Sequence, residues 1–475
     1  MRTPMVITAL TGAFLLSAMG TASADDTLGI DSYVRDYVER TGLPGAMVAV
    51  TKGDKVVLTA GYGHTADGDA ITKDSPMPLA SVSKSFTALA VTKLAEEGKV
   101  KLDAPVRQYL PEFTMADPRA AKITVRQLLH QTSGMSDRSF PELTLDAPAT
   151  LKDSVAMLRT AGLSAEPGAR MYYHNPNYSL LGRLVEVVAK RPFAEHMAAG
   201  VFRPLGMNAT KTVDTTLELP GAAKGYVRAY GRTVPRSHPE WFINGSYGVV
   251  STADDMARWL IAQNGDRPAI KATHQGSGVG ESTYAMGWNT GRTPGGAPML
   301  KHTGWLLTHN SAQILLPGSG YGIAVVTNTG MISGDDAAII ADGLIDLAEG
   351  RPDQRLAPFT SSADPILAGM TLLTLALGAL GVYRARTWAR RRSGRATWRL
   401  VVRLAPYALP VALFAGLAEL FALLMNRSGT LAQISYVWPA LFVWTATAAL
   451  TALAVAGTRI FHTVRARRQR VTFTG

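Results

Sequence analysis

A serine and a lysine stand three residues apart, at Ser81 and Lys84, where a run of apolar residues with helical spacing begins. On an α-helix, residues i and i+3 lie on one face with Cβ atoms about 5–6 Å apart, so the lysine amine can reach the serine hydroxyl. Serine is a weak nucleophile near neutral pH and needs an adjacent base. Lysine can be that base when burial or nearby charge lowers its pKa. The pair predicts a nucleophilic serine, although a helix start with exposed Ser and Lys shows the same pattern.

Two further motifs, later in the chain, hold residues that could serve such a serine. Tyr173 and Asn175 lie on a predicted loop that follows a Pro-Gly turn and precedes an apolar helical run. The tyrosine could relay a proton if neighbouring ammonium groups lowered its pKa. The asparagine offers a donor and an acceptor to a substrate amide. His302-Thr303-Gly304 lies on a run with strand character, where the glycine would let a substrate backbone approach closely.

The chain around these motifs predicts a mixed α/β fold of the α+β type. Two β-rich runs flank a Lys-Gly-Asp turn and predict a hairpin. Two later strand-like runs are separated by a Pro-Gly-Ser-Gly turn. Strands are predicted at 46–50, 55–60, 299–302, 311–316 and 322–327, and helices at 28–40 and 335–350. This pattern favours an antiparallel sheet with flanking helices.

The start of the chain reads as an export signal. An arginine precedes an apolar run at 5–19, and an Ala-Ser-Ala sequence suits cleavage after Ala24. The run is short for a membrane span, and a retained anchor is the alternative. We therefore predict a signal peptide at 1–24 and an exported domain at 25–350. The sequence has no cysteine, which excludes disulfides, thiolate nucleophiles and zinc–thiolate sites.

The last part of the chain predicts a membrane domain at 365–475, after a linker at 351–364. Three apolar stretches of spanning length lie at about 365–383, 405–425 and 436–458. Arginines crowd the segment between the first two stretches and the segment after the third, while the connection at 426–435 holds one arginine. The positive-inside rule places both arginine-rich segments in the cytoplasm and residues 25–363 outside. Glu419 lies within the second stretch, either as a functional carboxylate or as a partner for a neighbouring polar group.

The positive charge of the chain belongs to this tail. The formal net charge is +12, and from residue 384 onward there are fourteen arginines and no lysine. From residue 364 onward only Asp364 and Glu419 are acidic. Removing these from totals of 48 basic and 36 acidic residues leaves 34 of each, so residues 1–363 are nearly neutral. A nucleic-acid partner is therefore disfavoured, because its binding needs a basic patch on the folded domain.

The three motifs occur in the order and approximate spacing of class C β-lactamase-like and penicillin-binding-protein-like serine hydrolases, the S12 type of serine peptidases. The chain resembles this family over roughly residues 28–350. The resemblance implies a class C-like antiparallel sheet with flanking helices and a helical lobe, and a substrate class of small peptides, acyl-amino acids or esters. No metal or cofactor is implied. The domain order, with three membrane helices last, is similar to that of the prodrug-activating peptidase of the colibactin pathway.

The resemblance also implies a role for each motif residue. Ser81 would be the acylated nucleophile, and Lys84 and Tyr173 would share the general-base and general-acid work. Asn175 would orient the substrate amide. The backbone N–H groups of Ser81 and Trp305 would form the oxyanion hole. The residues that would line the strand along which the substrate lies are His302, Thr303 and Gly304.

Two departures from the family pattern bear on the substrate. Many penicillin-recognising members have Lys-Thr-Gly where this chain has His302-Thr303-Gly304, so the lysine position is occupied by histidine. His302 is largely neutral at pH 7 and cannot replace a permanent cation. The tyrosine motif reads Tyr-His-Asn in place of Tyr-Ser-Asn. We therefore favour a membrane-anchored extracytoplasmic peptidase or amidase acting on D-amino-acid-containing or N-acyl substrates. The alternatives are a penicillin-binding DD-peptidase, a β-lactamase, an esterase, or a non-enzymatic sensor of β-lactams or wall fragments.

Overall fold

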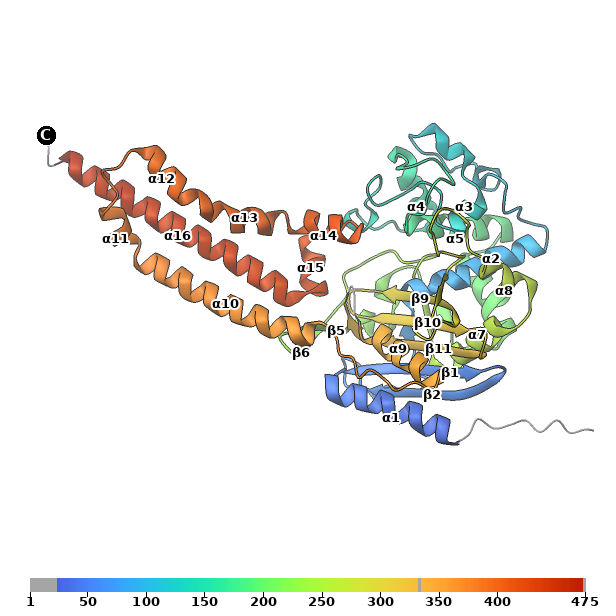
Figure 1. Ribbon diagram of the computed structural model, residues 1–475. Coiled ribbons are helices and arrows are strands. Elements are labelled where there is room, and N and C mark those ends of the chain that lie inside the picture. The colour runs from blue at the N-terminus through green and yellow to red at the C-terminus, as the bar shows by residue number, and fades with distance from the viewer. Residues whose placement is uncertain (1–23, 332–334, 473–475) are drawn as a thin grey trace, which may run out of the picture.

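The computed structural model describes residues 24–331 and 335–472 (Figure 1). The expected signal peptide therefore lies outside the described residues, apart from Ala24. Within them, a six-stranded sheet has the order β2-β1-β11-β10-β9-β8, and each neighbouring pair is antiparallel. Its strands are β1 (Gly45–Lys52), β2 (Lys55–Gly63), β8 (Asn289–Arg292), β9 (Pro298–Trp305), β10 (Asn310–Leu316) and β11 (Tyr321–Thr327). The predicted antiparallel sheet and its hairpin are confirmed.

The sheet is buried because helices cover both of its faces. Successive side chains of a strand point to opposite faces, and in β1 the residues Ala46 and Val48 pack into one apolar cluster while Met47 and Ala49 pack into another. The first cluster includes residues of α1 (Ala24–Thr41) and α9 (Asp336–Ala348), and helices at 28–40 and 335–350 were predicted from the sequence. The second includes α7 (Ala253–Asn264) and α2 (Ser83–Glu96). Strands covered on both faces form the rigid centre of the domain.

A helical lobe lies at the β8–β9 side of the sheet (Figure 1). Helix α2 runs between the sheet and this lobe, and nearly every residue of the helix is buried, as expected for a helix packed on all sides. The helices of the lobe and its surroundings are α3 (Val125–Leu129), α4 (Leu151–Met157), α5 (Pro176–Ala189), α6 (Phe193–Met197) and α8 (Pro268–Thr273). Two small sheets contain β3 (Met77–Pro78), β7 (Val249–Ser251) and β4 (Lys211–Thr212), and β12 (Thr329–Gly330), β5 (Gly225–Ala229) and β6 (Arg232–Arg236).

The C-terminal part is a bundle of helices that extends away from this domain (Figure 1). Among the described residues, three helices are long and apolar enough to span a membrane: Thr360–Tyr383, Thr397–Ala415 and Pro439–Gln469. The helices of this part are α10 (Thr360–Tyr383), α11 (Ala385–Arg390), α12 (Thr397–Leu404), α13 (Ala408–Ala415), α14 (Leu417–Met425), α15 (Leu431–Val437) and α16 (Pro439–Thr472). This arrangement indicates association with a membrane.

The second candidate span differs from the expected one. It ends at Ala415, whereas composition alone predicted an apolar span reaching 425. Gly416 leaves the helical conformation, with φ −91° and ψ 12°, and α14 starts anew after it. Helices α14 and α15 therefore lie between the bundle and the N-terminal domain (Figure 1). Glu419 is in α14, where it is exposed and outside the candidate span.

Candidate active site

The serine and lysine of the first motif meet at the start of α2. Ser81 lies in a 3₁₀ turn (Ala80–Val82) that leads directly into the helix, and Lys84 lies in its first turn. Lys84 Nζ is 3.0 Å from Ser81 Oγ, as the i,i+3 spacing predicts. Ala80 has a φ of +48°, an uncommon conformation for a residue with a Cβ. Strain of this kind persists only where the surroundings hold it, and it often marks a functional site.

Lys84 is buried and held by polar neighbours. Its Nζ also lies 2.8 Å from Asn175 Oδ1 and 3.1 Å from the carbonyl oxygen of Ser246. Burial lowers the pKa of Lys84 well below its ordinary value, and the positive charge of Arg427 lowers it further. A neutral amine has a lone pair that can accept the serine proton. Lys84 therefore meets the requirement stated from the sequence, that burial or nearby charge lower the pKa of a lysine base.

Tyr173 is hydrogen-bonded to Ser81, and burial raises the pKa of its phenol to about 12. This is opposite to the lowered pKa that neighbouring ammonium groups would produce. The reason is that removal from water outweighs the attraction of nearby positive charge, which here comes from Arg427. Tyr173 therefore keeps its proton at neutral pH and can donate it, while Lys84 is the stronger candidate for the base.

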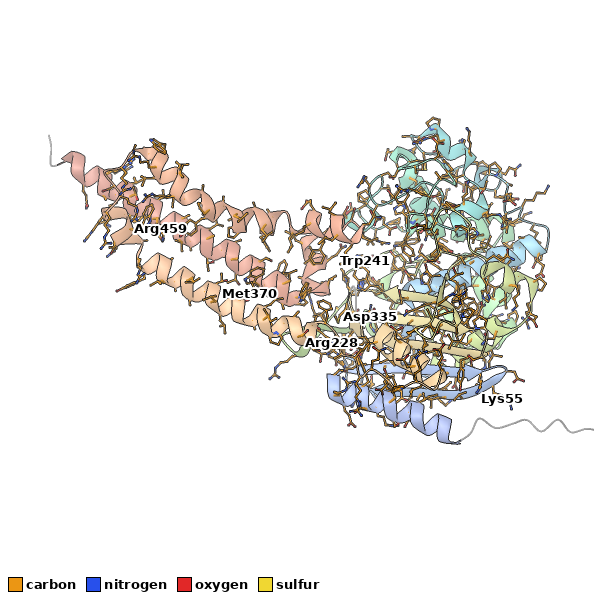
Figure 2. All side chains as sticks on the ribbon, viewed as in Figure 1. Lys55, Arg228, Trp241, Asp335, Met370 and Arg459 are labelled. Atoms are coloured by element: carbon orange, nitrogen blue, oxygen red, sulfur yellow. The ribbon has the colours of Figure 1, made fainter. Side chains whose placement is uncertain are left out.

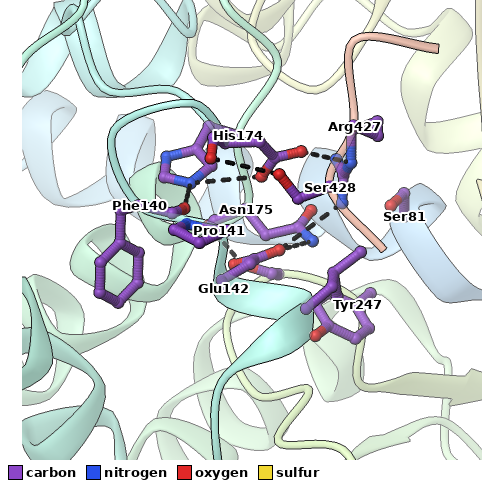
Figure 3. Close-up of polar contacts among 12 residues, drawn as sticks. Ser81, Phe140, Pro141, Glu142, His174, Asn175, Tyr247, Arg427 and Ser428 are labelled. Atoms are coloured by element: carbon purple, nitrogen blue, oxygen red, sulfur yellow. Dashed lines mark hydrogen bonds and ion pairs between the residues drawn. The ribbon is translucent and has the colours of Figure 1, made fainter. Parts of the chain in front are cut away.

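The amide of Asn175 links Lys84 to a carboxylate. Its Oδ1 accepts from Lys84, and its Nδ2 donates to Glu142 (Figure 3). Both amide groups thus have a partner inside the protein, and Asn175 also lines the cavity, so its role in orienting a substrate amide stays a prediction. His174 is fully buried, and its Nε2 lies 2.9 Å from the carbonyl oxygen of Phe140. The histidine of the Tyr-His-Asn motif therefore supports the loop that carries Glu142.

Strand β9 brings the third motif to the same site. His302 Nδ1 lies 2.7 Å from the Thr303 carbonyl oxygen, and its Nε2 lies 3.3 Å from the Tyr284 hydroxyl. This arrangement requires the proton on Nδ1. Burial, together with nearby Lys84, lowers the pKa of His302 to about 3, so the ring is neutral as expected.

Gly304 has a structural reason to be glycine. A Cβ at this position would lie 2.5 Å from the Leu79 carbonyl oxygen and closer still to Ser311 Oγ. Strand β9 can therefore pack against the turn before Ser81 only if the residue has no side chain. Gly304 therefore allows β9 to contact the turn that carries Ser81, and its predicted contact with a substrate backbone stays a prediction.

These residues surround a cavity of about 400 Å³. The predicted site residues that line it are Ser81, Tyr173, Asn175, His302, Thr303 and Trp305. Lys84 and Gly304 lie behind this lining. The structure therefore brings all eight predicted residues together from three separate parts of the chain. Within the described residues, no group of three or more His, Cys, Asp or Glu is placed to hold a metal.

The sequence interpretation missed a second set of residues at the cavity. Trp241 and Tyr247 line it from the segment before β7, and Figure 2 shows Trp241 on the side of the domain that faces the helical bundle. Glu142 gave no signal, because its loop has no periodicity or motif. Arg427 had one weak signal, since it is the one arginine of the connection between the second and third apolar stretches. Its guanidinium lies 3.0 Å from Asp137 Oδ2.

The sequence matches the Beta-lactamase family over residues 30–344. It is 31% identical to protein flp of Staphylococcus aureus over 321 residues, which are 64% of this chain and 63% of that protein, so the chain spans less than two thirds of that relative. It is 30% identical to penicillin-binding protein 4 of Amycolatopsis lactamdurans over 343 residues, covering 66% of this chain and 89% of the relative.

The fold is also similar to a solved structure, that of the octameric penicillin-binding protein homologue from Pyrococcus abyssi. The TM-score is 0.59 with 24% identity, over 70% of this chain and 80% of the other. The family match at residues 30–344 contains the six-stranded sheet, the helical lobe and every predicted site residue. With a family match over more than half of its length and this fold, the chain belongs to the Beta-lactamase family and is a serine hydrolase.

Proposed function

We propose that the protein is a membrane-anchored peptidase or amidase that works outside the cytoplasm and cleaves D-amino-acid-containing or N-acyl substrates through an acyl-Ser81 intermediate. The observation that carries the mechanism is the buried Lys84 amine, 3.0 Å from Ser81 Oγ. The lowered pKa of Lys84 favours the neutral amine that a base requires. Ser81 itself faces the cavity, where a substrate carbonyl can reach it.

The proton moves in a closed cycle. Lys84 accepts the proton of Ser81 as Oγ attacks the carbonyl carbon, and the resulting oxyanion is bound by the backbone N–H groups of Ser81 and Trp305. Tyr173 donates its proton to the leaving nitrogen, and the ammonium of Lys84 restores it. Water then attacks the acyl carbon, and its proton passes to the Tyr173 hydroxyl as that hydroxyl gives its own proton to the neutral Lys84 amine. Lys84 returns this proton to Oγ as the bond to the acyl carbon breaks, so Ser81 leaves as the hydroxyl.

The charge of the site supports a substrate without a carboxylate beside the scissile bond. His302 is neutral and occupies the position at which penicillin-recognising relatives would hold a cation. Arg427 lines the cavity, but it faces Asp137 at 3.0 Å and Glu142 at 3.6 Å. A substrate carboxylate would therefore have to compete with two protein carboxylates, whereas a neutral amide would not.

The helical bundle supports the proposed topology, in which the N-terminal domain lies outside the cytoplasm. Its arginine-rich end, with α11 and Arg459, lies far from the N-terminal domain (Figures 1 and 2). Arginines are concentrated on the cytoplasmic side of membrane proteins. The N-terminal domain then lies on the opposite side, outside the cytoplasm, with its cavity close to the membrane.

The test uses the full-length protein in detergent with three probes: an N-acyl-D-amino-acid amide, a short-chain ester and benzylpenicillin. We expect hydrolysis of the amide, an acyl adduct on Ser81 by intact mass, and loss of both in Ser81→Ala. A stable penicillin adduct without amide hydrolysis would refute the substrate class in favour of penicillin recognition. Turnover of the ester alone would make the protein an esterase, and turnover that survives Ser81→Ala would refute the mechanism.

A further inference from the structure

The outer wall of the cavity comes from the membrane-associated tail. Catalytic-domain residues form one side of the cavity, and the other side is formed by α14, α15 and the connection between them. The tail residues that line it are Ala418, Phe421, Met425, Asn426, Arg427, Ser428, Gly429, Thr430, Gln433, Ile434 and Val437. Tail residues that lie 337 or more positions after Ser81 thus share a cavity with it. The N-terminal domain by itself leaves this cavity open on one side.

The connection is attached to one particular loop of the catalytic domain. Ser428 Oγ donates to the Asp137 carbonyl oxygen at 3.3 Å, and Gln433 Nε2 donates to the Leu143 carbonyl oxygen at 2.7 Å. Gln433 also belongs to a capping box with Thr430 that starts α15. The loop at 137–143 is the one that carries Glu142. The tail therefore holds the loop on both sides of the carboxylates that face the active site.

Arg427 supplies the positive charge for these carboxylates. Its Nε lies 3.0 Å from Asp137 Oδ2, and its Nη2 lies 3.6 Å from Glu142 Oε1 (Figure 3). Its guanidinium carbon lies 5.6 Å from the ring centre of Tyr173. The side chains of Asp137 and Glu142 are only 5% and 14% exposed. Two carboxylates so far from water need a paired cation to stay ionised.

The carboxylate of Glu142 in turn fixes the orientation of Asn175. An amide side chain donates from its nitrogen and accepts at its oxygen. When Glu142 is an acceptor, the nitrogen of Asn175 must face it and Oδ1 must face Lys84, as observed. A protonated Glu142 could donate instead, and the amide could then rotate and present its nitrogen to Lys84. The lysine would lose the acceptor that holds it 3.0 Å from Ser81.

We propose that Arg427, carried by the connection between the second and third candidate spans, is a positioning residue of the active site that keeps Glu142 as the acceptor orienting Asn175 and hence Lys84. The proposal rests on the proposed acyl-serine function and deepens it, because it makes the membrane-associated tail part of the catalytic apparatus. The charged and titratable groups facing Glu142 are Asp137 on its own loop, Lys84 on α2, Tyr173 before α5, Tyr247 before β7 and Arg427 on the tail.

The test measures the reactivity of Ser81 without a native substrate. A fluorophosphonate phosphonylates a nucleophilic serine with release of fluoride, and its second-order rate is measured from pH 5 to 9 on full-length protein in detergent. We expect Arg427→Gln to lower the rate roughly 10- to 100-fold, as small misplacements of catalytic groups do. Arg427→Lys should recover part of the loss. Burial raises the pKa of Glu142 to about 7, and the charge of Arg427 opposes that rise and also lowers the pKa of Lys84. The rising limb of the pH profile should therefore move to higher pH in Arg427→Gln.

Two further variants distinguish positioning of the active site by Arg427 from general attachment of the tail to the catalytic domain. Arg236→Gln removes a different contact with the tail, the 2.9 Å hydrogen bond to the Ser435 carbonyl oxygen, and should leave the rate unchanged. Glu142→Gln should slow labelling, and adding Arg427→Gln to it should change little, since both residues act through one chain of contacts. Equal labelling of wild type and Arg427→Gln at every pH, or full additivity with Glu142→Gln, would overturn the proposal. Absence of Ser81 labelling in the wild type would instead refute the acyl-serine function.

Discussion

Replacing Lys84 by methionine tests the centre of the mechanism. The change keeps an unbranched side chain of similar length in a fully buried position, but it removes the amine that lies 3.0 Å from Ser81 Oγ. A positioned base contributes about 10²–10⁴-fold to the rate. At 1.36 kcal/mol for each factor of ten, this equals roughly 3–5 kcal/mol of barrier. We expect labelling of Ser81 by the fluorophosphonate, and turnover of the amide, to fall by that factor.

The same substitution has a cost in stability that must be measured beside the rate. Methionine leaves Asn175 Oδ1 and the Ser246 carbonyl oxygen without their donor. Each orphaned buried acceptor costs about 1–3 kcal/mol, and relief from burying the amine offsets part of this. Thermal unfolding therefore accompanies the rate measurement.

The matched control is Lys93→Met, which lies on the same helix and bonds to the Gly200 carbonyl oxygen at 2.6 Å, away from the cavity. Lys93→Met should label like the wild type. The wild-type labelling rate should also reach its plateau at a pH far below the ordinary pKa of lysine, because burial lowers the pKa of Lys84. A folded Lys84→Met variant that labels at the wild-type rate would refute Lys84 as the base.

Three further predictions concern the surroundings of the site. Gly304→Ala should lower the free energy of unfolding by about 1–3 kcal/mol and reduce labelling, because its Cβ would lie 2.5 Å from the Leu79 carbonyl oxygen; a denaturant titration would contradict this if stability were unchanged. His302→Gln should leave the pH profile between 5 and 9 unmoved, since the pKa of His302 is about 3, and a loss of the acidic limb would show that the histidine titrates there. Asp336→Asn should destabilise the domain by roughly 3–5 kcal/mol, because it leaves buried Arg228 without its carboxylate, and an unchanged melting temperature would argue against this pair as a structural contact.

The proposed role of Arg427 makes a prediction about the catalytic domain without its tail. A fragment ending near residue 363 would contain the sheet, the helical lobe and all of the predicted site residues. It would lack Arg427 and the apolar residues of α14 and α15 that close the cavity. Such a fragment should fold around its own core, because the two large apolar clusters lie within residues 30–345. On the proposal made above, its Ser81 would nevertheless be less reactive than in the full chain.

The features that could be predicted from the sequence depend on neighbours along the chain. Ser81 and Lys84 are in contact because residues i and i+3 of a helical turn lie on the same face, whatever surrounds that turn. The hairpin of β1 and β2 follows from β-rich runs around a short turn. The three candidate membrane spans follow from composition, since an apolar run of nearly twenty residues matches the thickness of a bilayer.

The remaining features depend on distances through space. Asn175 contacts Glu142 across 33 positions, and Arg427 contacts Asp137 across 290, so local patterns carry no trace of either pair. The direction of the Tyr173 pKa shift could not be predicted because burial, which decides it, is a property of the packed domain. The helix break at Gly416, after which α14 reaches the active site, could not be predicted either, because the apolar composition continues unchanged through it. Local spacing thus determines which residues can react, and long-range packing determines their protonation and the wall that closes over them.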